Sequence, residues 1–305
     1  MQIAASASRA AAASTSAAMW RLATALGRGL TPATPRAVGA VVGPLAAALT
    51  PSTRRVVAAT QRRVDPTLRP AALRRAVRRA YADYVRYYAE SFAVPHASAR
   101  VIERGFRVTG YEHIEAGLAR GRGVILALPH LGGWEWAGRW LVSRGLRLHV
   151  VVERLASRAA FDAFVRVREG WGATVIPLDD DAGAAVQRAL AANDVVALLC
   201  DRDVQGNGVA VRCFGEPTTV PAGPALLALR TGAALLPVGT YHGPGRYGHH
   251  AWVRPALEPV RAGRLRDDVA ALAQRLVHEV EGLVRRAPEQ WHVFTPNWEA
   301  DRGLA

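Results

Sequence analysis

Apolar runs and amphipathic segments alternate along the chain from residue 106 onward. Short runs rich in β-branched and aliphatic residues predict buried strands, and apolar residues repeated every three or four positions predict helices that cover them. The predicted strands are 106–109, 123–128, 146–152, 174–176, 195–199 and 234–240, with 251–253 as an antiparallel edge strand. The predicted helices are 114–119, 134–143, 157–171, 182–192, 222–230 and 265–286. This alternation predicts an α/β fold in which helices flank a mixed, mainly parallel central sheet.

In the N-terminal part of the chain the sequence pattern predicts helices and no strands. Four prolines are expected to break residues 20–64 into short helices, and residues 69–92 predict one long amphipathic helix. The region from 54 to 86 is strongly basic, with ten arginines against two aspartates. It is either a solvated helical surface or a membrane-associating segment whose basic, half-apolar face lies on anionic headgroups. The apolar stripe of the long helix consists of Leu73, Val77, Tyr81, Tyr84 and Tyr88.

Composition separates a tail from a single domain. Residues 1–18 are low-complexity alanine and serine without the continuous apolar centre of a signal peptide. We expect a disordered tail there, or upstream sequence if translation begins at Met19. The rest is expected to form one domain at 19–298, with a helical region at 19–92 and an α/β core at 105–298.

The net charge of +14 comes from 39 arginines, because the chain contains no lysine. A charge of this sign favours an anionic partner such as membrane lipid, nucleic acid or a polyphosphate co-substrate. The longest apolar stretch, 37–49, is too short and too interrupted by glycine and proline to span a bilayer. The two cysteines, Cys200 and Cys213, form no disulfide framework, so the reducing cytosolic side is expected.

No group of cysteines or histidines has the sequence spacing of a zinc site. His242, His249 and His250 cluster near glycines, and the glycine- and proline-containing segment 243–246 between them predicts a hairpin loop. Solvated histidines beside that loop are the favoured interpretation, so we expect no metal.

The segment LPHLGGWEW at 128–136 places His130 five residues before Glu135, where an apolar strand gives way to a helix. In open α/β sheets, ligands bind at the carboxyl ends of strands. A histidine there can act as a general base, and a nearby carboxylate can fix its tautomer and stabilise the imidazolium. The pair Gly132-Gly133 permits a tight turn that would bring Glu135 back toward His130. The alternative is a histidine at a strand edge, with Glu135 capping the helix.

The same segment resembles the His-x4-Asp/Glu block of the lysophospholipid and glycerolipid acyltransferase superfamily. Further blocks follow in the order typical of the bacterial lipid A lauroyl acyltransferases and their actinobacterial branch, the phosphatidylinositol mannoside acyltransferases. The resemblance covers about residues 69–298. These blocks are VVER at 151–154, REGWG at 168–172, LCDRD at 199–203, FGEPT at 214–218, GPA at 223–225, TGA at 231–233 and PEQW at 288–291.

The resemblance implies an acyl-CoA-dependent O-acyltransferase that transfers a long acyl chain, palmitoyl first, to a mannose hydroxyl of a phosphatidylinositol mannoside. His130 would be the general base and Glu135 its partner, with acyl-CoA as co-substrate and no bound cofactor. The other implied partners are a membrane glycolipid acceptor and an anionic membrane surface, but no nucleic acid. The location would be peripheral, on the cytoplasmic face of the plasma (inner) membrane.

Four further residues are candidates for substrate binding. The resemblance implies that Glu153 and Asp201 shape the site, although each could instead cap a helix or pair with the arginine that follows it. Arg168 is a candidate for a phosphate of donor or acceptor, because guanidinium matches phosphate geometry, and an ordinary surface arginine is the alternative. Asp203 is a weaker candidate for the same site.

Two other functions stay open. Transfer of lauroyl or myristoyl to lipid A would use the same fold and chemistry, but the lysine-free, arginine-rich composition is typical of actinobacteria, which lack lipid A. A non-catalytic basic protein that binds membranes or nucleic acid would explain the charge but not the ordered blocks.

Overall fold

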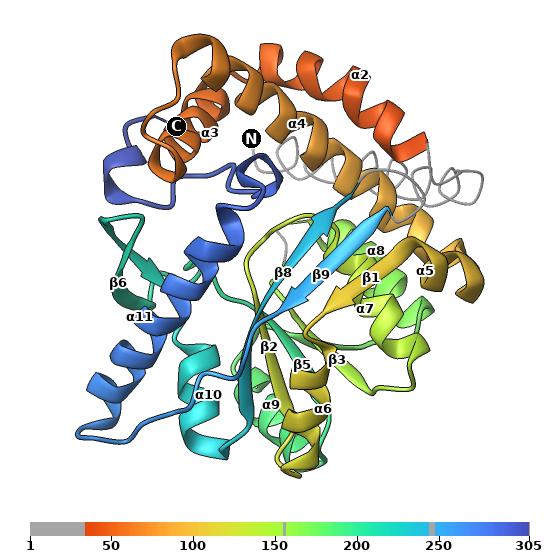
Figure 1. Ribbon diagram of the computed structural model, residues 1–305, viewed down its shortest axis with the longest axis vertical. Helices are drawn as coiled ribbons and strands as arrows, with labels where there is room; N and C mark the ends of the chain where they lie inside the picture. Colours follow the sequence, from red (N-terminus) through yellow and green to blue (C-terminus); the bar gives the residue numbers. More distant parts are fainter. Residues whose placement is uncertain (1–33, 155–156, 244–247, 305) are drawn as a thin grey trace, which may run out of the picture.

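The protein has at its centre a seven-stranded sheet of order β1-β9-β8-β2-β5-β3-β4 (Figure 1). The computed structural model describes residues 34–154, 157–243 and 248–304, so the predictions for 1–18 and Met19 lie outside the described residues. Strands β8, β2, β5, β3 and β4 run parallel, β9 is antiparallel to β8, and β1 is parallel to β9. The predicted mixed, mainly parallel sheet is confirmed. The strands are β1 (Phe106–Thr109), β2 (Val124–Leu128), β3 (Leu148–Val152), β4 (Thr174–Pro177), β5 (Val195–Leu199), β8 (Ala234–His242) and β9 (His249–Val253).

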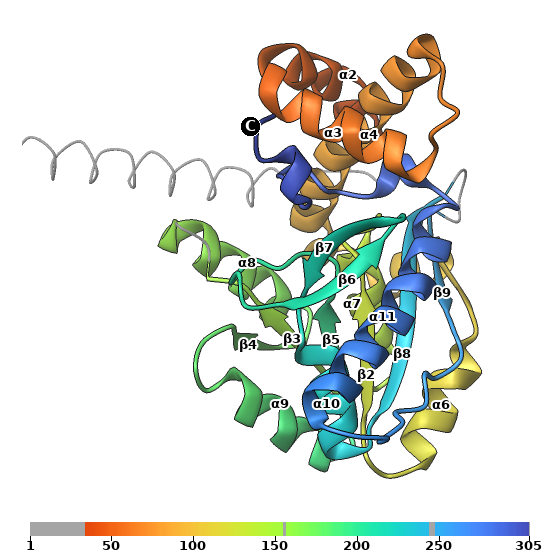
Figure 2. The same ribbon diagram turned by 90° about the vertical axis from the view of Figure 1, so that its left-hand side faces the viewer.

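Two strand predictions need correction. The 251–253 strand is antiparallel, as predicted, but it is internal, because the short strand β1 pairs with its outer side. A separate hairpin of β6 (Val209–Cys213) and β7 (Glu216–Val220) was not predicted. These two strands alternate exposed side chains with half-buried or buried ones, so they lack a continuous apolar run. Strand β6 packs near α11 (Leu265–Val284), as Figure 2 shows.

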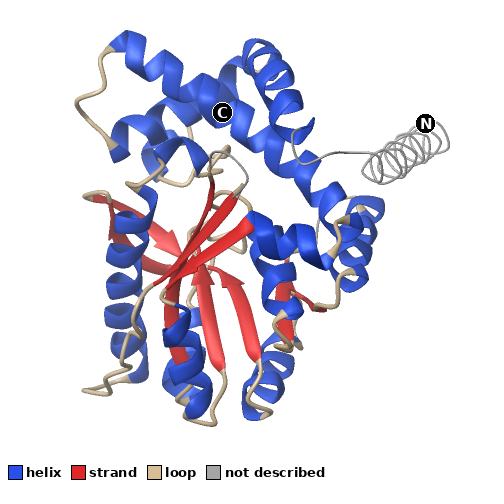
Figure 3. Ribbon diagram, turned by 45° about the vertical axis from the view of Figure 1, so that its right-hand side comes forward, coloured by secondary structure: helices blue, strands red, loops and turns tan. Residues whose placement is uncertain are grey.

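Helices cover both faces of the sheet and bury a separate apolar core on each (Figure 3). Alternate residues of the central strands point to opposite cores: Ile125 and Ala127 of β2 face one, and Leu126 and Leu128 face the other. One layer contains α9 (Ala182–Ala191), α10 (Gly223–Thr231) and α11, and the other contains α5 (Ala99–Gly105), α6 (Tyr111–Ala119), α7 (Trp134–Ser143) and α8 (Arg158–Gly170).

The N-terminal helices α2 (Thr34–Leu49), α3 (Pro51–Val64) and α4 (Pro70–Ala93) form a third layer over one end of the sheet (Figure 1). The long amphipathic helix predicted at 69–92 is confirmed as α4, but α2 continues through Pro44 instead of breaking there. Close packing of α2 on α4 depends on glycine, because a Cβ at Gly43 would lie 2.5 Å from the backbone of Ala82. None of the described helices is both long and apolar enough to cross a bilayer.

Candidate active site

The pairing of β2 with β5 brings His130 and Asp201 together. Leu128 lies opposite Leu199 in this parallel pair, and each polar residue follows two positions later, at the same edge of the sheet. His130 Nδ1 donates to Asp201 Oδ1 at 2.7 Å, and the His130 backbone N–H donates to Asp201 Oδ2 at 2.9 Å. The carboxylate therefore fixes the imidazole with Nδ1 protonated, which leaves Nε2 free to accept a proton.

Asp201 is held as an anion in a buried position. Burial alone would raise the pKa of Asp201, but His130 and the indole N–H of Trp291, at 2.7 Å, lower that pKa below its ordinary value. The Asn297 side chain donates to the Asp201 carbonyl at 3.0 Å and fixes the backbone there. A buried carboxylate beside a partly exposed imidazole is the arrangement that stabilises a transient imidazolium.

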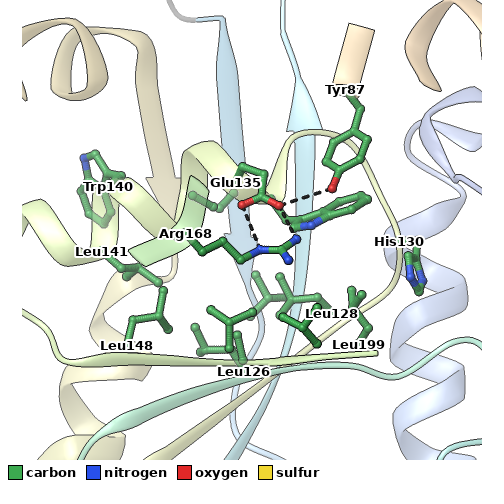
Figure 4. Close-up of a pocket in the computed structure, with 18 of the residues that line it drawn as sticks. Tyr87, Leu126, Leu128, His130, Glu135, Trp140, Leu141, Leu148, Arg168 and Leu199 are labelled. Carbon is green, nitrogen blue, oxygen red and sulfur yellow. Dashed lines mark hydrogen bonds and ion pairs between the residues drawn. The ribbon is translucent and has the colours of Figure 1, made fainter. Parts of the chain in front are cut away.

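Glu135 does not contact His130, so the expected pairing of these two residues is corrected. Glu135 lies in the first turn of α7, and its carboxylate faces Arg168 of α8 and the Tyr87 hydroxyl of α4, away from His130 (Figure 4). Arg168 Nε donates to Glu135 Oε2 at 3.2 Å, and its Nη2 donates to Oε1. Gly132 in the intervening turn has a φ of +59°, and in the helix that follows Glu135 points toward Arg168 and not back toward His130.

Arg168 is neither a surface arginine nor a free phosphate ligand. Its side chain is 9% exposed and lies 5.3 Å above the ring of Phe164. Burial works to lower the pKa of Arg168, but the carboxylate of Glu135 raises it above its ordinary value, so the guanidinium remains charged. Because its guanidinium is occupied by Glu135, the predicted phosphate contact is corrected to a buried ion pair between α7 and α8.

The other two candidates lie at different places on the edge of the sheet. Glu153 follows β3 on the rim of the cavity described below and is exposed; the neighbouring Arg154 pairs instead with Asp179 at 2.7 Å. Asp203 accepts hydrogen bonds from the backbone N–H groups of Gly206 and Gly208 at 2.9 and 2.8 Å. Asp203 therefore organises the loop that precedes β6, and its expected role in substrate binding stays a prediction.

An apolar cavity of about 230 Å³ opens beside His130 and extends between the sheet and helices α7 and α8. In Figure 4, His130 lies at one end of this space and Trp140, Leu141 and Leu148 at the other, with Leu126, Leu128 and Leu199 along the sheet side. A narrow apolar cavity with a base at one end suits a long hydrocarbon chain whose reactive carbonyl lies at that base.

Three residues of this site were missed as candidates. Tyr87 donates to Glu135, and Trp291 donates to Asp201; the second belongs to the PEQW block and could have been proposed from it. Arg202 lines the cavity next to Asp201, and within the described residues it makes no hydrogen bond or ion pair with a side chain. It had been considered only as a partner for Asp201.

Comparison with known proteins gives the chemical class. Residues 7–300 match the family described as bacterial lipid A biosynthesis acyltransferase. The chain belongs to this family. It is 38% identical over 223 residues to a phosphatidylinositol mannoside acyltransferase of Mycobacterium tuberculosis, covering 72% of this chain and 68% of the relative. It is 35% identical over 228 residues to the protein of the same name from Mycolicibacterium smegmatis, covering 74% and 73% of the two chains. The chain is therefore an acyltransferase, and its relatives are named for acyl transfer to a glycolipid.

Proposed function

We propose that this acyltransferase moves a long acyl chain, palmitoyl first, from coenzyme A to a mannose hydroxyl of a phosphatidylinositol mannoside, with His130 as the general base. The observation that carries the proposal is the His130–Asp201 pair at the end of an apolar cavity. His130 Nε2 takes the hydroxyl proton as the sugar oxygen attacks the thioester carbonyl. The C–S bond then breaks, and the imidazolium returns the proton to the departing thiolate. No acyl-enzyme is needed.

The donor's phosphates need a cation near the mouth of the cavity. Arg168 is unsuited because its guanidinium already binds Glu135. Arg202 follows Asp201 directly and lines the cavity, which makes it the better candidate to pair with a phosphate of the donor or the acceptor.

The choice of acceptor rests on the relatives and on composition. Both mycobacterial relatives are named for phosphatidylinositol mannoside, and the lysine-free, arginine-rich sequence is typical of actinobacteria. The test is to incubate the purified protein with labelled palmitoyl-CoA and either phosphatidylinositol mannosides or a lipid A precursor, and to identify the products by mass spectrometry. Acylation of the mannoside alone would support the proposal, and acylation of the lipid A precursor alone would replace it with the alternative.

Filling the cavity should shorten the chain that the enzyme accepts. Ala197 of β5 lines the cavity and is only partly buried, so the Ala197→Phe ring would enter that space without displacing the core. We expect transfer from palmitoyl-CoA to fall by about ten-fold or more, because losing room for two methylenes removes roughly 1.6 kcal/mol of burial. Transfer from octanoyl-CoA should change little. Rates over a series of chain lengths measure this.

The matched control for that series is Ala184→Phe, which adds the same ring to the exposed face of α9. It should leave the chain-length profile unchanged. An Ala197→Phe protein that prefers palmitoyl as strongly as the wild type would show that the chain binds elsewhere.

The N-terminal layer supports a peripheral location on an anionic membrane, for which we propose the cytoplasmic face. Val41, Leu45 and Leu49 are 65%, 61% and 81% exposed along α2, and arginines are abundant on the neighbouring α3 and α4. Apolar side chains beside cationic ones suit insertion into the headgroup region. Because α4 also contacts the active-site turn, this layer would hold the site close to a membrane-bound acceptor.

We therefore expect the protein to sediment with phosphatidylglycerol vesicles at low salt and to be released at about 1 M salt, where the screening length falls to about 3 Å. The double change Leu45→Asn with Leu49→Asn should weaken recovery further, whereas Val260→Asn, at an exposed site outside this layer, should not. Equal recovery with phosphatidylcholine and phosphatidylglycerol vesicles would contradict this location.

A further inference from the structure

A buried cluster of two histidines and a glutamate lies between α4 and the strands β8 and β9. Glu90, His242 and His249 each offer one ligand atom, and these atoms all lie within 4.8 Å of one another. His249 Nε2 lies 2.6 Å and His242 Nε2 lies 3.1 Å from the same oxygen, Oε2 of Glu90. Their side chains are 6%, 1% and 4% exposed, so the expectation of solvated histidines is wrong for His242 and His249.

His242 has a nitrogen that the protein leaves without a hydrogen bond. Its Nδ1 lies 2.7 Å from Asp83 Oδ1 and donates to that carboxylate, so a neutral His242 points the lone pair of Nε2 toward Glu90. This Nε2 is buried and has no hydrogen-bond partner of acceptable geometry in the described part of the chain. A buried lone pair that faces a carboxylate oxygen is unfavourable unless a proton or a metal ion lies between them.

We propose that Glu90, His242 and His249 bind a divalent transition-metal ion, with zinc as the best fit to two imidazoles and one carboxylate. These are ordinary zinc ligands, and imidazole selects such ions over magnesium or calcium. Ligands of a tetrahedral zinc lie roughly 3.3 Å apart, given metal–ligand bonds of about 2.0–2.1 Å. The shortest contact, 2.6 Å between His249 Nε2 and Glu90 Oε2, would therefore need to open by about 0.7 Å.

Asp83 and Arg86 surround the cluster and orient its side chains, as hydrogen-bonding groups around a metal site do. The contact of Asp83 with His242 Nδ1 is the carboxylate–histidine arrangement that orients a metal-binding imidazole. Arg86 Nε donates to the other oxygen of Glu90 at 2.7 Å and so directs Oε2 toward the histidines. A bound cation would add to the guanidinium of Arg86 in balancing the carboxylates of Asp83 and Glu90.

The position of the cluster assigns the ion a structural role. A Cβ at Gly133 would lie 2.9 Å from His242 Nε2, so the cluster packs directly behind the turn that follows His130. The ring of Trp136 in α7 stacks on His249 with centroids 4.2 Å apart. An ion held there would tie α4 to β8 and β9 and support the turn that follows His130.

The test uses the full-length protein, stripped with a chelator and reloaded with Zn²⁺ at about pH 8, where a zinc ion can displace the proton that Asp83 and Glu90 favour on His242. Elemental analysis after desalting should find about one zinc per chain, and the melting temperature should rise on reloading. His249→Gln keeps a side chain that can bond to Glu90 but removes the imidazole, and should lower zinc retention at least ten-fold. The control His96→Gln, at an exposed histidine, should retain zinc as the wild type does.

Each outcome decides the question without an activity assay, so failure here is distinct from failure of the proposed function. If His249→Gln does not fold, visible absorption of the wild type reloaded with Co²⁺ reports histidine ligation directly. Wild-type protein that keeps no zinc and gives no Co²⁺ absorption would overturn the proposal and leave a proton on His242 Nε2 as the neutralising cation. Equal loss of zinc in the two variants would overturn it too.

Discussion

Replacing His130 with alanine will abolish acyl transfer while the protein stays folded. A general base of this kind contributes roughly 10²–10⁴-fold to the rate. Its imidazole is partly exposed and packs mainly against Trp134 and Asp201, so its removal leaves the two main cores intact. Transfer of labelled palmitoyl measures the effect on activity, and thermal melting together with acyl-CoA binding measures the integrity of the fold and the cavity.

A matched control is His278→Ala, which changes an exposed histidine on α11. This helix covers the other face of the sheet from α7 and α8, which border the cavity. This variant should transfer at the wild-type rate. If His130→Ala keeps a tenth of wild-type transfer, His130 is not the base, and the family relationship would then describe the fold without assigning the residue.

The Glu135→Gln change will reduce stability more than any other substitution considered for this site. It leaves the guanidinium of Arg168, which is 9% exposed, without a counter-charge in the interior. Breaking one partner of a buried ion pair costs about 3–5 kcal/mol, so urea unfolding should shift to clearly lower concentration. Turnover per folded molecule should fall much less than in His130→Ala, because Glu135 does not touch the imidazole.

The double variant Glu135→Gln with Arg168→Met is the control for this prediction. Removing both charges should recover most of the lost stability, because no unpaired charge is then left in the interior. If Glu135→Gln unfolds at the wild-type urea concentration and yet loses turnover as strongly as His130→Ala, then Glu135 takes part in the chemistry directly.

The fold class could be predicted because the central strands and the long helix have clear hydrophobic patterns in their own local sequence. The apolar runs at β2 and β5 have buried side chains on both faces, and α4 shows a clear apolar stripe. The β6–β7 hairpin gave no such signal, since its side chains alternate and only a few are buried. The place of β9 inside the sheet depends on its pairing with β1, which is about 140 residues away in the chain and leaves no local pattern.

Individual residues of the site could be predicted from the sequence, but the contacts between them could not. His130 and Asp201 could each be selected as a polar residue after an apolar strand, but their contact depends on β2 and β5 being neighbours in the sheet. Glu135 is close to His130 in sequence, and that proximity favoured a contact that the direction of α7 prevents. The burial of His242 was missed for the same reason, since the carboxylate that covers it comes from α4.

The most direct test of the central claim is the steady-state rate of palmitoyl transfer by Asp201→Asn. The amide keeps the size of Asp201 and can still accept from Trp291, but it cannot stabilise the imidazolium. We expect kcat to fall by roughly 10²–10⁴-fold while KM for palmitoyl-CoA changes little, and we expect Asp203→Asn to keep the wild-type kcat. An Asp201→Asn enzyme with wild-type kcat would contradict the assignment of His130 and Asp201 as the base and its positioning partner.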